Sequence, residues 1–164
     1  MTRNDLISEL VRQDSGDPWH GPSRATVLAG VTAEQAAWQP GTGVHSIWEI
    51  VLHMRSWTRE VRRRTLGGDP GSPVDGDWPS LPNKPTAAAW ERALESLRAS
   101  HAQLLETVGS LSEEQLGERV GSGDDPDRPS ITRRMMLYSL VQHDIYHTGQ
   151  IALLKRLAGG GGSG

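Results

Sequence analysis

The stretch MLYSLVQHDIYHTGQIALLKRL, residues 136–157, decides the fold of this chain. Within it, candidate core positions recur at alternating spacings of four and three residues, the period of one face of an α-helix. These positions are Met136, Leu140, His143, His147, Gln150, Leu154 and Leu157. Two histidines and a glutamine therefore occupy the centre of a stripe that is apolar at both ends. Burying them costs free energy unless each finds a partner, so the pattern predicts a partner inside the core.

The rest of the chain also carries helical patterns. Ser46, Thr86 and Ser130 are expected to cap three long helices, and a break at Ser15–Pro18 divides a less regular first region. The expected helices are 3–13, 22–30, 47–66, 87 to about 108, and 130 to about 158. Long helices with one apolar stripe must bury it against each other, which predicts an all-α four-helix bundle. Residues 1–158 would form a single domain and the glycine-rich residues 159–164 a flexible tail.

Two connecting features also stand out. Residues 67–85 hold five prolines and four glycines, so this segment is expected to be either a long crossover or a functional lid. A short capped segment occurs twice, as Val31–Gln35 and Leu111–Gln115, which indicates two related helix pairs unless the match is chance.

Composition excludes several classes of protein. The 164 residues include no cysteine, which rules out disulfides and thiolate metal sites and fits a cytoplasmic protein. No apolar run approaches a membrane span, and the first residues lack the apolar segment of a signal peptide. Net charge is -3, and the one basic cluster, Arg59 with residues 62–64, is expected to be a solvated helix end. Neither a membrane nor nucleic acid is therefore an expected partner.

Three histidines suggest a metal site. His143 and His147 are four residues apart, so one helix face presents both rings to the same point. His53 lies mid-way along the helix 47–66, beside its apolar stripe. Three neutral imidazoles can hold one divalent ion and leave positions open for water or substrate, which is typical of catalytic sites. The alternative is that these are core histidines that are hydrogen-bonded within the protein.

Other side chains are candidates for the surroundings of this site. Trp57, one helical turn after His53, is expected to wall a pocket, and Gln150 to orient a ligand. His101 lies on the apolar stripe of its helix and would be either a fourth ligand or a core residue. For His20, at the break in the first helical region, either role is open. His45, just before a helix cap, is expected to be exposed.

Asp144 follows the first histidine of the pair, where zinc peptidases with the His-Glu-x-x-His pattern have their general base. Aspartate is one methylene shorter than glutamate, which weakens the comparison. At about 100° around the helix from His143, Asp144 is alternatively expected to point outward.

Two segments resemble the signature regions of the DinB-like (YfiT-like) proteins. They are HSIWEIVLH, residues 45–53, and QHDIYHTGQI, residues 142–151. The segments Trp19–Ser23 and Val31–Gln35 also fit, and the resemblance extends over nearly the whole chain to residue 158. It implies an up-down-down-up bundle with a long crossover, commonly a homodimer, whose metal-binding triad maps onto His53, His143 and His147.

The resemblance also implies a chemistry. The metal is expected to be zinc or nickel, with iron or manganese as alternatives, because imidazoles alone do not select one ion. Some members of the family act on small molecules with mycothiol or bacillithiol, so the leading hypothesis is a metal-dependent transferase that uses a low-molecular-weight thiol. The alternatives are a metal-dependent hydrolase, with Asp144 or Glu49 as base, and a non-catalytic metal-binding stress-response protein.

Overall fold

The structure is a computed structural model that describes residues 1–121 and 131–160. Over these residues the regular structure is helical, apart from one isolated bridge between Arg119 and Thr132, which confirms the all-α prediction. The helices are α1 (Arg3–Ser15), α2 (Arg24–Leu28), α3 (Ala33–Ala37), α4 (Ile47–Thr65), α5 (Ala87–Ser110), α6 (Glu113–Gly117) and α7 (Arg133–Gly160).

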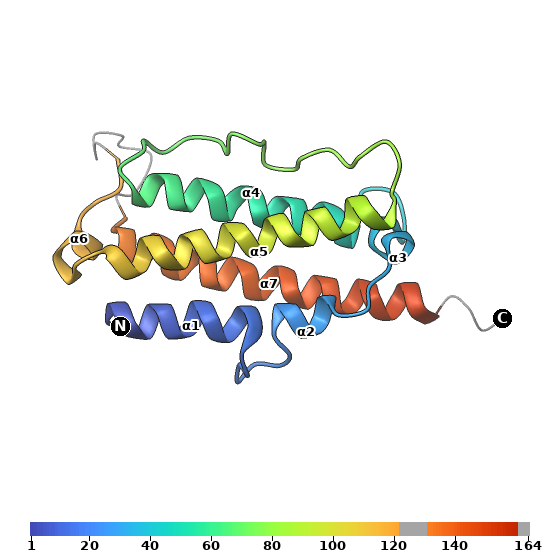
Figure 1. Cartoon of the computed structure of the whole chain (residues 1–164), viewed down its shortest axis with the longest axis horizontal. Helices are drawn as coiled ribbons and strands as arrows, with labels where there is room; N and C mark the ends of the chain where they lie inside the picture. Colours follow the sequence, from blue (N-terminus) through green and yellow to red (C-terminus); the bar gives the residue numbers. More distant parts are fainter. Residues whose placement is uncertain (122–130, 161–164) are drawn as a thin grey trace.

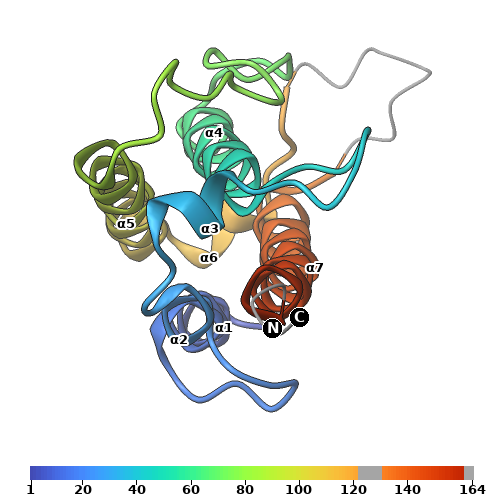
Figure 2. The same ribbon diagram turned by 90° about the vertical axis from the view of Figure 1, so that its right-hand side faces the viewer.

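Four long helical elements lie side by side: α1 continued by α2, then α4, α5 and α7 (Figures 1 and 2). The first and last run in one direction, and α4 and α5 run in the other (Figure 1). Because α4 and α5 are parallel, residues 66–86 must return the chain along the whole length of the bundle. This is the up-down-down-up topology with a long crossover that the resemblance implies.

Capping interactions begin the helices where the sequence predicts. The Ser46 hydroxyl accepts a hydrogen bond from the Glu49 N–H at 3.2 Å, and the Glu49 carboxylate accepts one from the Ser46 N–H at 2.7 Å. The recurring short segments form α3 and α6, and each begins with the same reciprocal capping box.

The start and end of α7 differ from the prediction. The expected cap, Ser130, lies outside the described residues, and the Thr132 hydroxyl accepts from the Met135 N–H at 3.2 Å. The helix continues to Gly160, two residues past the expected end. Leu157 was predicted to be buried but is 48% exposed, because α7 extends beyond its neighbours at this end (Figure 1).

On α5, the apolar stripe that carries His101 is buried, with Trp90 at one end and Val108 at the other. On α7, the stripe positions His143 and Gln150 are only partly buried. The outward orientation of Asp144 is wrong, since this carboxylate is buried. The reason is that α7 has two packed faces, one against α4 and one against α1 and α2 (Figure 2).

The basic end of α4 is partly solvated, as predicted, and partly paired. Arg59 and Arg63 are 57% and 41% exposed. Arg63 and Arg64 both pair with the buried carboxylate of Glu60, at 2.8 and 2.7 Å, and Arg59 pairs with Asp75 at 2.7 Å. Two acidic groups therefore offset only part of the positive charge. None of the described helices is both long and apolar enough to cross a bilayer. The structure holds one chain, so the homodimer stays a prediction.

We expect Ser46→Ala to lower the free energy of unfolding by about 1–2 kcal/mol, because the buried Ser46 hydroxyl satisfies the N–H of Glu49 in the first turn of α4. Thr86→Ala is the matched control: Thr86 caps α5 with the same bond, to the Ala89 N–H, but at an exposed position. Urea denaturation of both variants measures the difference, and equal losses would contradict the role of burial.

Candidate metal centre

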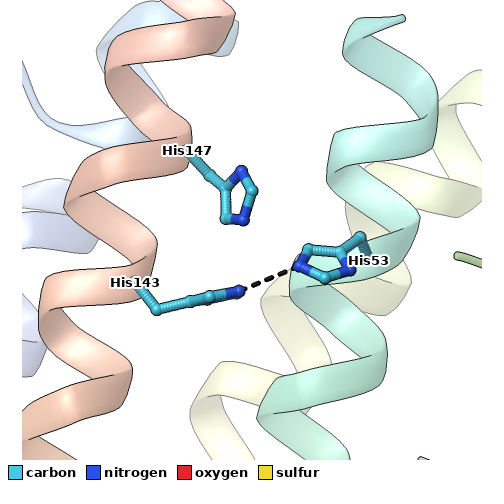
Figure 3. Close-up of side chains that lie close together, drawn as sticks. All are labelled: His53, His143 and His147. Atoms are coloured by element: carbon cyan, nitrogen blue, oxygen red, sulfur yellow. Dashed lines mark hydrogen bonds between the residues drawn. The ribbon is translucent and has the colours of Figure 1, made fainter. Parts of the chain in front are cut away.

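Three imidazoles converge between α4 and α7. His53 projects from the middle of α4, and His143 and His147 project from successive turns of α7 toward it (Figure 3). One nitrogen from each ring lies within 4.8 Å of the others, and Nε2 of His53 is 2.9 Å from Nε2 of His143. His53 and His147 are buried, while the His143 side chain is 28% exposed and forms the solvent side of the cluster.

Each of the three rings is oriented by an oxygen atom at Nδ1. The His53 Nδ1–H donates to the backbone carbonyl of Asp77 at 2.7 Å. The His147 Nδ1–H donates to the side-chain oxygen of Gln150, also at 2.7 Å, and His143 Nδ1 faces the Asp144 carboxylate at 3.4 Å. The acceptors at His53 and His147 place the proton of each neutral ring on Nδ1, so Nε2 carries the lone pair. The Nδ1 contact of His143 is longer, and its Nε2 instead lies in hydrogen-bond distance of His53 Nε2.

Nε2 of His53 and Nε2 of His143 lie 2.9 Å apart, so a proton or a metal ion must lie between them, since two facing lone pairs would repel. Burial lowers the pKa of His53 and lowers that of His147 to about 4, which favours the neutral form of these two rings. Neutral imidazole is the form that binds a divalent cation. In a tetrahedral zinc site two imidazole nitrogens lie about 3.3 Å apart, and one nitrogen from each of these rings lies within 4.8 Å of the others.

A buried network of ion pairs and hydrogen bonds holds the Asp144 carboxylate next to Nδ1 of His143. One oxygen of Asp144 faces the His143 ring, and the other accepts hydrogen bonds from Arg24 at 3.0 Å and from Gln13 at 3.3 Å. Arg24 also pairs with Asp14. Arg24 and Asp144 are 2% and 1% exposed, so α1 and α2 hold the carboxylate that positions a histidine of α7.

The crossover covers the site. Its residues 75–78, which we call the strap, lie along α4 and are fixed by three kinds of bond. The Ser56 hydroxyl donates to the Gly76 carbonyl at 2.6 Å, Trp57 Nε1 donates to the Asp77 carboxylate at 2.7 Å, and Asp75 pairs with Arg59. Gly76 has φ of 85°, a left-handed conformation that favours glycine at this turn. Residues 67–85 are therefore the crossover that the sequence predicts, and the functional lid stays a prediction.

Aromatic rings wall the cluster on two sides. Trp57, as predicted, lies beside it, with ring centroids 6.4 Å from those of both His53 and His143. Trp78 of the strap stacks on His53 at 3.9 Å, and on its other face it stacks on His45 at 3.6 Å. His45 was expected to be exposed, and its side chain is 43% exposed although it stacks on Trp78. No pattern in the crossover distinguished Trp78 or Asp77 as site residues.

Two predicted candidates lie elsewhere. His101 is buried but is not part of the convergent group, and its Nε2 lies 3.8 Å from Asp14. His20 is exposed in the loop between α1 and α2. Gln150 does contact the cluster, through His147.

Comparisons with known proteins agree with this fold. A family model described as the DinB superfamily matches residues 24–151. A crystal structure of a DinB-like protein from Bacillus subtilis, YjoA, is similar over 95% of this chain and 93% of that one, with 16% identity and a TM-score of 0.67. A conserved protein from Enterococcus faecalis is similar over 96% and 95%, with 17% identity and a TM-score of 0.62. No curated protein matches the sequence.

In the metal-free protein, we expect the free energy of unfolding to decrease as the pH falls from about 7 to about 5. The pKa of His147 is about 4 in the folded chain, against an ordinary value of 6.5. Between these values the unfolded chain binds a proton that the folded chain does not, so acid favours unfolding. Urea denaturation at about pH 7, 6 and 5 measures the slope.

His147→Gln is the comparison for this measurement. We expect a shallower slope in the variant, with a remainder from His53 and His101, whose pKa values burial also lowers. Identical slopes in the two proteins would show that His147 is protonated as easily in the fold as in the unfolded chain.

Proposed function

The chain belongs to the DinB superfamily, and from this premise we propose that it binds one divalent transition-metal ion through Nε2 of His53, His143 and His147. The observation that carries the proposal is the convergence of the three rings, each with an oxygen beside Nδ1, so that Nε2 is left to bind the ion. Oxygen partners at the second nitrogen are the usual supports of metal-binding histidines. Zinc and nickel fit an all-imidazole site best, and iron and manganese are alternatives.

We expect the untagged protein to bind about one equivalent of zinc or nickel per chain, and His147→Ala to lose it, because two imidazoles hold an ion far less tightly than three. His20→Ala is the matched control, since His20 is an exposed histidine in a loop. Elemental analysis after dialysis measures the stoichiometry. A full equivalent retained by His147→Ala would refute the site.

Asp144→Asn tests whether the Asp144 carboxylate supports His143 as a ligand. The variant keeps all three histidines, so the metal stoichiometry should persist while the affinity for the metal falls by about 10- to 100-fold. Circular dichroism must first show that the variant is folded, because Asp144 also pairs with buried Arg24.

We further propose that the protein is a transferase that uses a low-molecular-weight thiol such as mycothiol or bacillithiol. A divalent ion supplies a charge that lowers the pKa of a thiol bound to it, which makes thiolate available at neutral pH. The chain has no cysteine, so the nucleophilic sulfur must come from the cosubstrate. The exposed edge of His143 and the side of Trp57 leave an approach for that molecule.

Two carboxylates were candidates for the base that a hydrolase needs beside its water, and neither is well placed for that role. Asp144 is bonded to Arg24 and faces the back of His143. Glu49 accepts hydrogen bonds from Ser46 and Gln39 on one of its oxygens, at the start of α4. A third carboxylate, Asp77, lies 3.3 Å from the His53 ring and is 58% exposed, so hydrolysis stays the alternative.

We expect the zinc- or nickel-loaded protein to accelerate the addition of mycothiol or bacillithiol to an electrophile, and His147→Ala to lose the acceleration because thiolate no longer forms at neutral pH. His20→Ala should keep it. Loss of the electrophile's absorbance, with and without thiol, measures the reaction. A rate equal to that of metal-stripped protein contradicts thiol transfer, and turnover without thiol would indicate hydrolysis.

A further inference from the structure

A pocket of about 380 Å³ opens beside the imidazole cluster, within the size range of small-molecule sites. Its walls come from the loop before α4, from the strap and from α7, and we call it the lateral pocket. His147 and Gln150 line it on the side of the cluster, so the lateral pocket and the metal centre share two residues.

The lining of the lateral pocket is apolar and uncharged. Apart from His45, His147 and Gln150, its side chains are hydrocarbon or aromatic, and they include Val44, Trp78, Tyr146 and Leu153. Among its described lining residues there is no carboxylate, lysine or arginine. Without a metal ion on His147, an anionic ligand would lose water here and meet no lysine or arginine, whereas a neutral apolar ligand would lose little.

The pocket is partly rigid and partly open to water. Trp78 is held between two imidazoles, with interplanar angles of 7° to His45 and 13° to His53, so this wall exists before a ligand arrives. On the opposite rim Val44, Tyr146 and Leu153 are 44%, 64% and 59% exposed. An apolar ligand would cover this exposed surface, which is a favourable contribution to binding.

We propose that the lateral pocket binds the hydrocarbon body of an uncharged electrophile, an α,β-unsaturated carbonyl compound, and directs its reactive carbon toward His147; this assignment of substrate class rests on the proposed thiol transfer. In the reaction, the cosubstrate sulfur bonds to the β-carbon and the π electrons of the C=C bond move onto the carbonyl. The proton lost by the thiol ends on the α-carbon. Nothing is oxidised and no group leaves.

The test separates binding from turnover. The unreactive neutral probe is 4-phenylbutan-2-one, and the anion of similar size is 3-phenylpropanoate. Titration calorimetry on the metal-free protein should show the ketone binding about 10-fold or more tightly than the carboxylate, because the pocket has no cation to pair with the latter. Equal affinities, or tighter binding of the anion, would overturn the proposal.

Two variants locate the binding. Leu153→Glu should weaken ketone binding about 10-fold or more, since it places a charge on the apolar rim. Leu66→Glu is the matched control, because Leu66 is also 59% exposed but lies at the other end of α4. It should leave ketone binding unchanged. Both changes are at exposed helical or cap positions, and thermal melts confirm that the variants fold.

Further outcomes distinguish the competing explanations. If Leu153→Glu turns a dimer into a monomer without changing ketone affinity, a second copy covers this surface and the proposal fails. If the protein binds metal but not the ketone, the metal centre stands and the lateral pocket fails. If ketone binding depends on Leu153 while thiol transfer is absent, the pocket stands as an apolar binding site and the substrate assignment fails with the proposed function.

Discussion

The central constraint of the structure is the convergence of three imidazole rings in the interface between α4 and α7. Burying three polar rings together is unfavourable unless each nitrogen finds a partner, and only one proton can lie between the facing Nε2 atoms of His53 and His143. The fold nevertheless fixes each ring from outside with the Asp77 carbonyl, the Asp144 carboxylate or the Gln150 amide. Apolar side chains would fill the same space at a lower cost in free energy. The arrangement of the three rings is therefore the one expected of a cation-binding site.

Most of the fold could be predicted because its determinants are local. Helix periodicity and the capping boxes at Ser46, Thr32 and Ser112 involve residues three or four apart, and the structure confirms them. The errors come from packing between helices. Leu157 has the right period, but no neighbouring helix extends far enough to cover it, and Asp144 is buried because α7 has a second packed face.

The candidate site could be predicted only in part for the same reason. The pair His143 and His147 is visible from spacing along one helix, and His53 from its place on an apolar stripe. The supporting groups join segments far apart in sequence: Asp144 pairs with Arg24, 120 residues away, and His53 with Asp77, 24 residues away. No periodic pattern connects such positions, so Arg24, Asp77 and Trp78 could be found only in three dimensions.

The crossover has a consequence for how this scaffold can change. Two consecutive parallel helices require a connection that travels back along α4, whose 19 residues span about 28 Å. That return path passes over the imidazole cluster. One wall of the cluster is therefore made by the strap, which is not part of any helix. Insertions or exchanges in this segment can change the surroundings of the imidazole cluster while the helix–helix contacts of the bundle stay the same. The walls of the cluster can thus vary without a change of fold.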